Sequence, residues 1–132
     1  MVRQKEYMKT KSITYWTTTM LVIAVMTVSG ILSLMHGPSM MKAFEHLGYP
    51  AYFANILGAA KVLGVCVLLM PGCVTLKEWA YAGFGITLIS ACVSHFVSGD
   101  GPASLEPLFF LAMLTVSYLT RPAGRRLVSQ PS

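Results

Sequence analysis

One lysine lies inside a long apolar stretch and is the first candidate for chemistry. Lys61 is the only charged residue in 51–70. A charge near the centre of a bilayer costs at least about 2.5 kcal/mol, so this side chain is expected to face the interior of a helix bundle. The residues that share its helical face are small or apolar: Ala54, Gly58 and Val65. Lys61 is therefore a candidate ligand-binding residue. A structural role is an equally weighted alternative, in which Lys61 donates hydrogen bonds to backbone carbonyls or extends its side chain to the inner membrane interface.

A second polar group lies between two later apolar stretches. His95 closes one stretch, Glu106 opens the next, and Asp100 lies in the turn between them. A carboxylate beside an imidazole can move a proton or hold a polar head group, so we take His95 and Glu106 as candidate catalytic residues and Asp100 as ligand-binding. The alternative, interfacial residues bonded to water, is preferred for His36 and His46. No histidine spacing resembles a helical metal pair, so no metal site is predicted.

Small and hydroxyl residues form a stripe that precedes His95. Its members are Ala80, Gly83, Thr87, Ala91 and Ser94. Thr87 is expected at about the depth of Lys61, and we assign Thr87 and Ser94 to ligand binding, with helix packing as the alternative. Glu78 falls on the opposite side of this helix and is expected to be solvated.

These residues need membrane-spanning helices to position them. The sequence is 55% hydrophobic and only 11% charged, far below the roughly 25% charged residues of soluble domains. Four apolar runs, each near the length that crosses the hydrocarbon core as a helix, are predicted to span the bilayer: 16–35, 51–70, 76–96 and 105–119. A short amphipathic helix, residues 40–47, is expected along the outer membrane surface rather than against the bundle.

The predicted fold class is an all-α, integral membrane four-helix bundle. Residues 1–121 form one transmembrane domain, and residues 122–132 form a polar C-terminal tail whose final residues are expected to be disordered. Of the ten Lys and Arg residues, eight lie at the N-terminus, between the second and third spans, or after the fourth span. Positive residues favour the cytoplasmic side, so both termini are predicted to be cytoplasmic in a cell membrane. The same distribution makes the basic residues a topology signal, and no nucleic-acid partner is predicted.

Three cysteines, Cys66, Cys73 and Cys92, form no close pair in the sequence. An odd, scattered set argues against a disulfide framework. It also argues against thiol redox chemistry within the chain, because such chemistry needs two neighbouring sulfurs.

Several motifs together resemble the DoxX-like membrane proteins, over roughly residues 15–121. They are Leu47-Gly48-Tyr49-Pro50, Tyr52-Phe53, Ile56-Leu57-Gly58, Lys61-Val62-Leu63-Gly64, Leu76 through Phe84, Ser94-His95 and Gly99-Asp100. The resemblance implies a bacterial four-helix membrane protein, and it marks Lys61, Glu78, His95 and Asp100 as the polar positions that match the family. The family takes its name from a membrane subunit of a thiosulfate:quinone oxidoreductase. More distant relatives are linked to redox complexes or to membrane-protein assembly.

The leading functional hypothesis is a small subunit of a membrane redox system in which the bundle binds a quinone or another apolar molecule with a polar head. A redox partner protein and a homo-oligomer are compatible with it. Two alternatives stay open. One is a stand-alone enzyme that performs acid–base chemistry on a lipid-soluble substrate, and the other is a non-catalytic scaffold or assembly factor. The sequence leaves open whether the protein is an enzyme.

Overall fold

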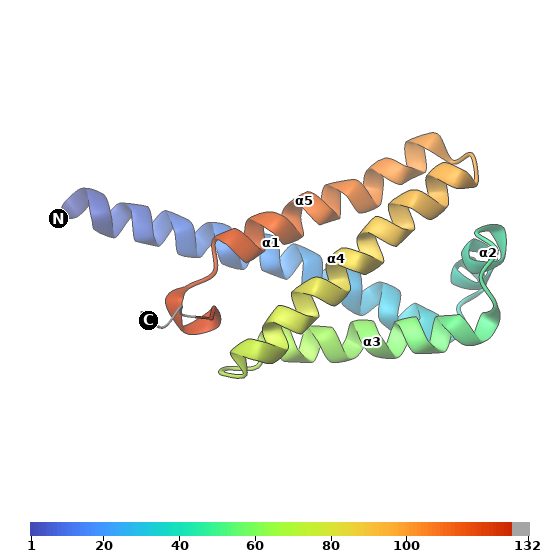
Figure 1. Cartoon of the computed structure of the whole chain (residues 1–132), viewed down its shortest axis with the longest axis horizontal. Helices are drawn as coiled ribbons and strands as arrows, with labels where there is room; N and C mark the ends of the chain where they lie inside the picture. Colours follow the sequence, from blue (N-terminus) through green and yellow to red (C-terminus); the bar gives the residue numbers. More distant parts are fainter. Residues whose placement is uncertain (128–132) are drawn as a thin grey trace.

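The computed structural model describes residues 1–127, and the regular elements in this range are all helices (Figure 1). Four helices are long and apolar enough to cross a membrane. They are α1 (Val2–Leu34), α3 (Ala51–Leu69), α4 (Val74–Val97) and α5 (Leu105–Leu119). The short α2 (Pro38–His46) connects α1 to α3, and two 3-10 turns, η1 (Gly101–Ser104) and η2 (Ala123–Arg125), flank α5. The predicted all-α fold with four spans is confirmed.

The first helix is longer than predicted. α1 begins at Val2, whereas the apolar run begins at Trp16. Hydropathy marks where a helix enters lipid, and the backbone hydrogen bonds of a helix can continue into water. The other three helices begin and end within two residues of the predicted spans. The turn between α3 and α4 depends on Gly72, which has φ of +71°, a conformation that costs glycine little.

The four long helices place the connections at two ends of the molecule. Figure 1 shows the start of α1, the α3–α4 turn and the end of α5 on the left, and α2 and the α4–α5 connection on the right. We call the left end the basic end, because Lys77, Arg121 and Arg125 lie there, and the right end the α2 end. Buried apolar side chains from all four long helices form the core: Val22, Ile23, Met26, Val65, Leu68, Tyr81, Phe84, Leu88 and Leu114.

The backbones of α1 and α3 approach each other closely at two glycines, Gly30 and Gly58. A Cβ atom built on Gly58 would lie 2.8 Å from the carbonyl oxygen of Gly30, so only glycine fits at this position. By contrast, α3 and α4 diverge from their shared turn, and α2 lies between their separated ends (Figure 1). The bundle is therefore tightly closed along α1–α3 and open between α3 and α4 at the α2 end.

The packing face of α4 differs from the small-residue stripe that the sequence suggested. Its buried residues are Lys77, Tyr81, Phe84 and Leu88. Gly83, in the predicted stripe, is exposed, and a Cβ atom there would meet nothing within 4 Å. The small residue that receives this helix is on α3, since a Cβ on Gly64 would lie 2.7 Å from the Phe84 ring. A large residue over a glycine, rather than a stripe of small residues, brings α3 and α4 together.

The short helix α2 is held by protein contacts. Phe44 is buried, and its ring makes edge-to-face contacts with Tyr49 and Phe53, at centroid distances of 6.1 and 6.3 Å. Phe44 therefore packs on the aromatic residues that follow α2 and not on lipid, whereas the location of α2 along the outer membrane surface stays a prediction.

Basic side chains close the C-terminal end of α3. The last carbonyls of a helix lack partners within it. Lys77, only 1% exposed, donates to the carbonyls of Val67 (2.9 Å) and Met70, and Arg125 donates to that of Leu68 (2.7 Å). Arg125 belongs to the predicted polar tail, so the first part of that tail is bound to the bundle. Residues 128–132 of the tail lie outside the described residues.

Candidate functional site

Two cavities meet at Lys61 in the open region of the bundle. The larger, about 380 Å³, lies between α2, α3 and α4, and the smaller, about 170 Å³, is bounded by α1, α3, α4 and α5. The residues that line both are Lys61, Thr87, Ala91 and His95. Three of the six site residues predicted from sequence are thus brought to the boundary of the two cavities, and a fourth, Glu106, lines the smaller one.

Lys61 lies beside the close contact of α1 and α3. Its Nζ donates a hydrogen bond to Ser29 Oγ on α1 at 3.2 Å. The side chain is partly buried, whereas its predicted face-mates are buried: Ala54, Gly58 and Val65. Lys61 therefore points into the bundle as predicted, and the described residues include no ion pair that involves it.

A histidine–aspartate–histidine cluster lies at the α2 end. Asp100 Oδ2 accepts hydrogen bonds from His46 Nε2 at 2.7 Å and from His95 Nδ1 at 3.2 Å. These bonds stabilise the charged carboxylate and hold the pKa of Asp100 below its usual range. The cluster joins the end of α2 to α4 and the α4–α5 connection. His46, which was expected to be bonded only to water, is thus a member of the site.

The carboxylate that contacts His95 is Asp100 rather than Glu106. Glu106 is exposed, and the described contacts include no hydrogen bond between it and His95. Both side chains still line the smaller cavity. The turn at Gly99 brings Asp100 back toward the end of α4, where its backbone N–H donates to the His95 carbonyl (2.9 Å). The His95 imidazole is therefore bonded to a residue of the turn that directly follows α4, and not to the first turn of α5.

Thr87 and Ser94 have different places in the structure. Thr87 lines both cavities, and its Oγ1 donates to the Gly83 carbonyl of its own helix at 2.8 Å. Ser94 lines neither cavity, but its Oγ is hydrogen-bonded to the Tyr49 hydroxyl at 2.6 Å. Tyr49 lines the larger cavity and stacks on Phe53 with a centroid distance of 5.0 Å. Ser94 therefore supports a cavity wall, and Thr87 is part of one.

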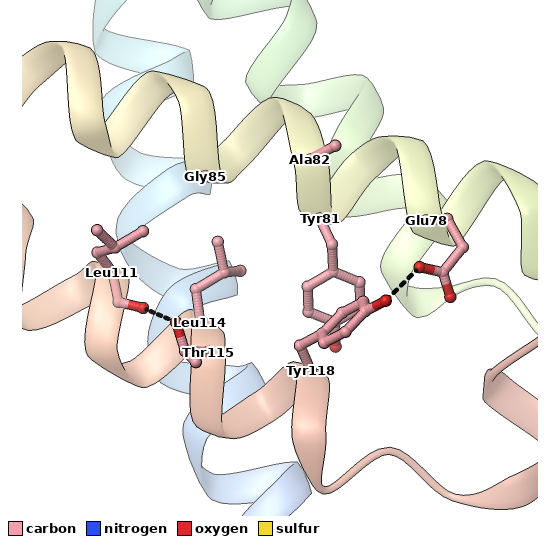
Figure 2. A pocket seen from close by; sticks show the side chains of 8 residues that line it. All are labelled: Glu78, Tyr81, Ala82, Gly85, Leu111, Leu114, Thr115 and Tyr118. Atoms are coloured by element: carbon pink, nitrogen blue, oxygen red, sulfur yellow. Dashed lines mark hydrogen bonds between the residues drawn. The ribbon is translucent and has the colours of Figure 1, made fainter.

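A third cavity, about 310 Å³, lies between α4 and α5 near the basic end. Figure 2 shows its lining, in which the rings of Tyr81 and Tyr118 meet edge to face and the Tyr118 hydroxyl donates to Glu78 (2.9 Å). Arg121 pairs with the same carboxylate at 2.5 Å, and its guanidinium lies 3.8 Å from the Tyr118 ring centroid. Glu78 is therefore an ion-paired residue, not the solvated one that the sequence suggested.

Sequence reasoning missed this ion-paired group because its members are 40 residues apart. Three observations could have suggested it. Glu78 and Arg121 are placed at the same membrane interface, Tyr118 lies three residues before Arg121 on one helical face, and Glu78 directly follows the basic residue Lys77. Beneath it, a buried hydroxyl chain runs from Tyr81 through Ser117 to Thr19 with distances of 2.7 and 2.5 Å.

The geometry at Lys61 suits binding of a mainly apolar molecule with one polar group. Sites of this kind have predominantly apolar walls and a few placed polar groups, and typical volumes begin near about 300 Å³. The hydrogen bond from Nδ1 to Asp100 fixes one imidazole tautomer of His95, which leaves its Nε2 lone pair available for a proton.

Within residues 1–127, no group of three or more His, Cys, Asp or Glu side chains is arranged to hold a metal ion. The three cysteines are free.

Comparison with known proteins gives a family but no close relative. No curated protein and no solved structure matches the chain. The model of the DoxX-like family matches residues 17–117. This match covers α3 and α4 completely, most of the apolar part of α1 and most of α5, and it includes Lys61, His95 and Glu106. The chain therefore belongs to the DoxX-like family.

Proposed function

We propose that this protein is a small membrane subunit whose bundle binds an apolar molecule with a polar head group, and that a quinone of a redox system is the first candidate. The observation that supports it is the meeting of two cavities at Lys61, Thr87 and His95 in otherwise apolar surroundings. A cavity of about 150 Å³ is enough to hold a benzene ring. The larger cavity thus has room for a substituted ring beside Lys61.

In this proposal Lys61 donates to the head group and His95 exchanges protons with it. Lys61 has an ammonium with three donors, of which Ser29 accepts one. Asp100 orients His95, which borders both cavities. Ser94 acts through Tyr49, and Glu106 supplies a carboxylate to the smaller cavity. The basic side chains at one end support an orientation with that end in the cytoplasm of a bacterial cell. A redox partner protein and a homo-oligomer remain predictions.

Binding of a decyl-substituted benzoquinone to protein in nanodiscs tests the proposal. Lys61→Met is expected to weaken binding about tenfold or more, because a hydrogen bond from a charged group contributes about 1.5–3 kcal/mol. Lys42→Met, which removes an exposed lysine of α2 outside the cavity lining, should leave affinity unchanged. Equal affinity in wild type and Lys61→Met, or no binding to the wild type, would contradict the proposal.

A stand-alone acid–base enzyme is the second candidate, and the His95–Asp100 hydrogen bond favours it. Such an enzyme should exchange ligand C–H protons with solvent. We would extract the apolar ligand that copurifies, return it to purified protein in deuterium oxide, and follow deuterium uptake by mass spectrometry. Uptake that His95→Gln abolishes and His36→Gln preserves would support catalysis. If neither cavity ligand nor exchange is found and only a protein copurifies, the scaffold alternative gains support.

A further inference from the structure

The polar groups that line the larger cavity with Lys61 are hydroxyls and the His95 imidazole, and none of them is a carboxylate. Ser29 is the one acceptor hydrogen-bonded to Lys61 Nζ in the described part of the chain. Across the larger cavity, α4 contributes the hydroxyls of Thr87 and Ser90. The Lys61 ammonium, which has three donors, is therefore hydrogen-bonded to one acceptor, and the lining of the larger cavity supplies no counter-charge.

The acidic residues of the chain are all engaged elsewhere or distant. The sequence has five, and all lie within the described range. Glu78 is paired with Arg121 at the basic end, and Asp100 is bonded to two histidines at the α2 end. The remaining three are exposed and form no ion pair with Lys61: Glu6, Glu45 and Glu106.

Glu106 requires separate consideration because it lines the smaller cavity together with Lys61. It lies in the first turn of α5, at the α2 end. Lys61 is ten residues into α3, which is about 15 Å along that helix from the same end at a rise of about 1.5 Å per residue. Glu106 can approach the mouth of the cavity, but the centre of the bundle near Lys61 keeps an unpaired positive charge.

Another part of the lining of the larger cavity is aromatic. Tyr49 and Phe53 stack with a centroid distance of 5.0 Å and an interplanar angle of 18°, and Phe44 meets both rings edge to face. Aromatic rings prefer offset-stacked or edge-to-face partners, so this wall suits a planar apolar body. The larger cavity thus combines aromatic residues that suit a planar ring with the ammonium of Lys61, which donates hydrogen bonds.

We propose that the preferred ligand is an aromatic anion, with a carboxylate or phenolate held by Lys61 and the Ser90 hydroxyl of α4, and with its ring against Phe44, Tyr49 and Phe53. The inference rests on the proposed binding cavity and narrows its ligand class. A negative oxygen accepts hydrogen bonds from Lys61 and also supplies the counter-charge that the larger cavity lacks. A neutral quinone carbonyl also accepts from the ammonium, but it leaves the positive charge without a counter-charge.

Two probes with the same ring system test the charge. Affinities of 2-naphthoate and of the neutral ketone 2-acetonaphthone would be measured by equilibrium dialysis against full-length protein in zwitterionic nanodiscs, with empty nanodiscs subtracted. We expect Lys61→Met to weaken naphthoate binding at least about tenfold more than it weakens ketone binding, because only naphthoate loses a counter-charge as well as a hydrogen bond. Lys61→Gln provides a second variant, thermal unfolding verifies that each variant is folded, and Lys42→Met should match the wild type for both probes.

The outcomes separate this inference from the proposed function. If Lys61→Met weakens both probes equally, or leaves naphthoate binding unchanged, the preference for an anion is refuted. If the decyl benzoquinone then still binds the wild type and requires Lys61, the proposed function stands without it. If none of the three probes binds, both proposals fall.

Discussion

Arg121 shows how this chain places a charge inside a bundle. It is 5% exposed, and its guanidinium lies over the rings of Tyr81 and Tyr118 while it pairs with Glu78. Arg121 Nε also donates to the Tyr118 carbonyl at 2.9 Å. Stacking on aromatic faces and a fork of donors are the two properties that suit arginine, rather than lysine, to such a position.

Removal of the Glu78 carboxylate should destabilise the fold, because the Arg121 guanidinium is buried. Glu78→Gln is expected to lower the free energy of unfolding by about 2 kcal/mol, because it leaves the buried guanidinium without its counter-charge. Thermal unfolding in nanodiscs measures the change. Glu6→Gln, which alters an exposed glutamate at the start of α1, is the matched control and should have no effect. Equal melting temperatures for the two variants would show that the ion pair is energetically neutral.

The pKa of Asp100 predicts a pH dependence with a definite sign. Its folded-state pKa is lowered by hydrogen bonds from His95 and His46, whereas the unfolded value is about 3.9. A lowered folded-state pKa stabilises the fold above pH of about 3.9, and this contribution disappears as pH falls through the folded-state pKa. The stability difference between wild type and Asp100→Asn should therefore be present near neutral pH and vanish in strong acid. Glu45→Gln, at an exposed position of α2, should show no such pH-dependent difference.

At the scale of elements, the contact of α1 with α3 tolerates no side chain at one position. Gly58→Leu should destabilise the bundle by about 2 kcal/mol or more, because even a Cβ atom there would overlap the Gly30 backbone. Gly83→Leu adds the same side chain to a long helix where a Cβ meets nothing within 4 Å, so its effect should stay within about 0.5 kcal/mol. Unfolding of both variants in matched nanodiscs is the measurement. Similar losses would mean that overlap between α1 and α3 is not the cause.

The sequence predicts helices of this protein better than their packing faces. Apolar length identified the four spans because a bilayer imposes that length. The face of α4 was predicted wrongly, since small residues can either approach a helix or simply face lipid, and Gly83 does the latter. Lys61 was placed correctly because the energetic cost of a charge in lipid leaves a single acceptable direction.

The candidate site was predictable in part, for a related reason. The depths of Lys61 and Thr87 follow from counting residues along two helices, and both line the same cavities. His46 was not predictable as a site residue, because its contact with Asp100 brings together two connections: the α1–α3 connection, which contains α2, and the α4–α5 connection. Contacts between connections depend on turn geometry, which periodicity does not describe.

At the scale of the whole molecule, the predicted orientation can be tested with cysteines. Cys73 is exposed in the α3–α4 turn, and Ser39 is exposed at the start of α2. In a background with Cys66 and Cys92 replaced by alanine, a membrane-impermeant maleimide added to intact cells should label Ser39→Cys and leave Cys73 unlabelled until the cells are opened. The reverse pattern would invert the topology, and labelling of both in intact cells would refute the assignment of the two ends to opposite sides.

The divergence of α3 and α4 has a consequence for how the surrounding lipid acts on the cavity. The two helices share a turn at the basic end and separate toward the other end, where α2 lies between them (Figure 1). The larger cavity is bounded by both helices and by α2. Lateral pressure in a bilayer pushes neighbouring helices together, and at this place it acts on the separation of α3 and α4. Bilayer tension and thickness are therefore expected to change the volume that is available to a ligand.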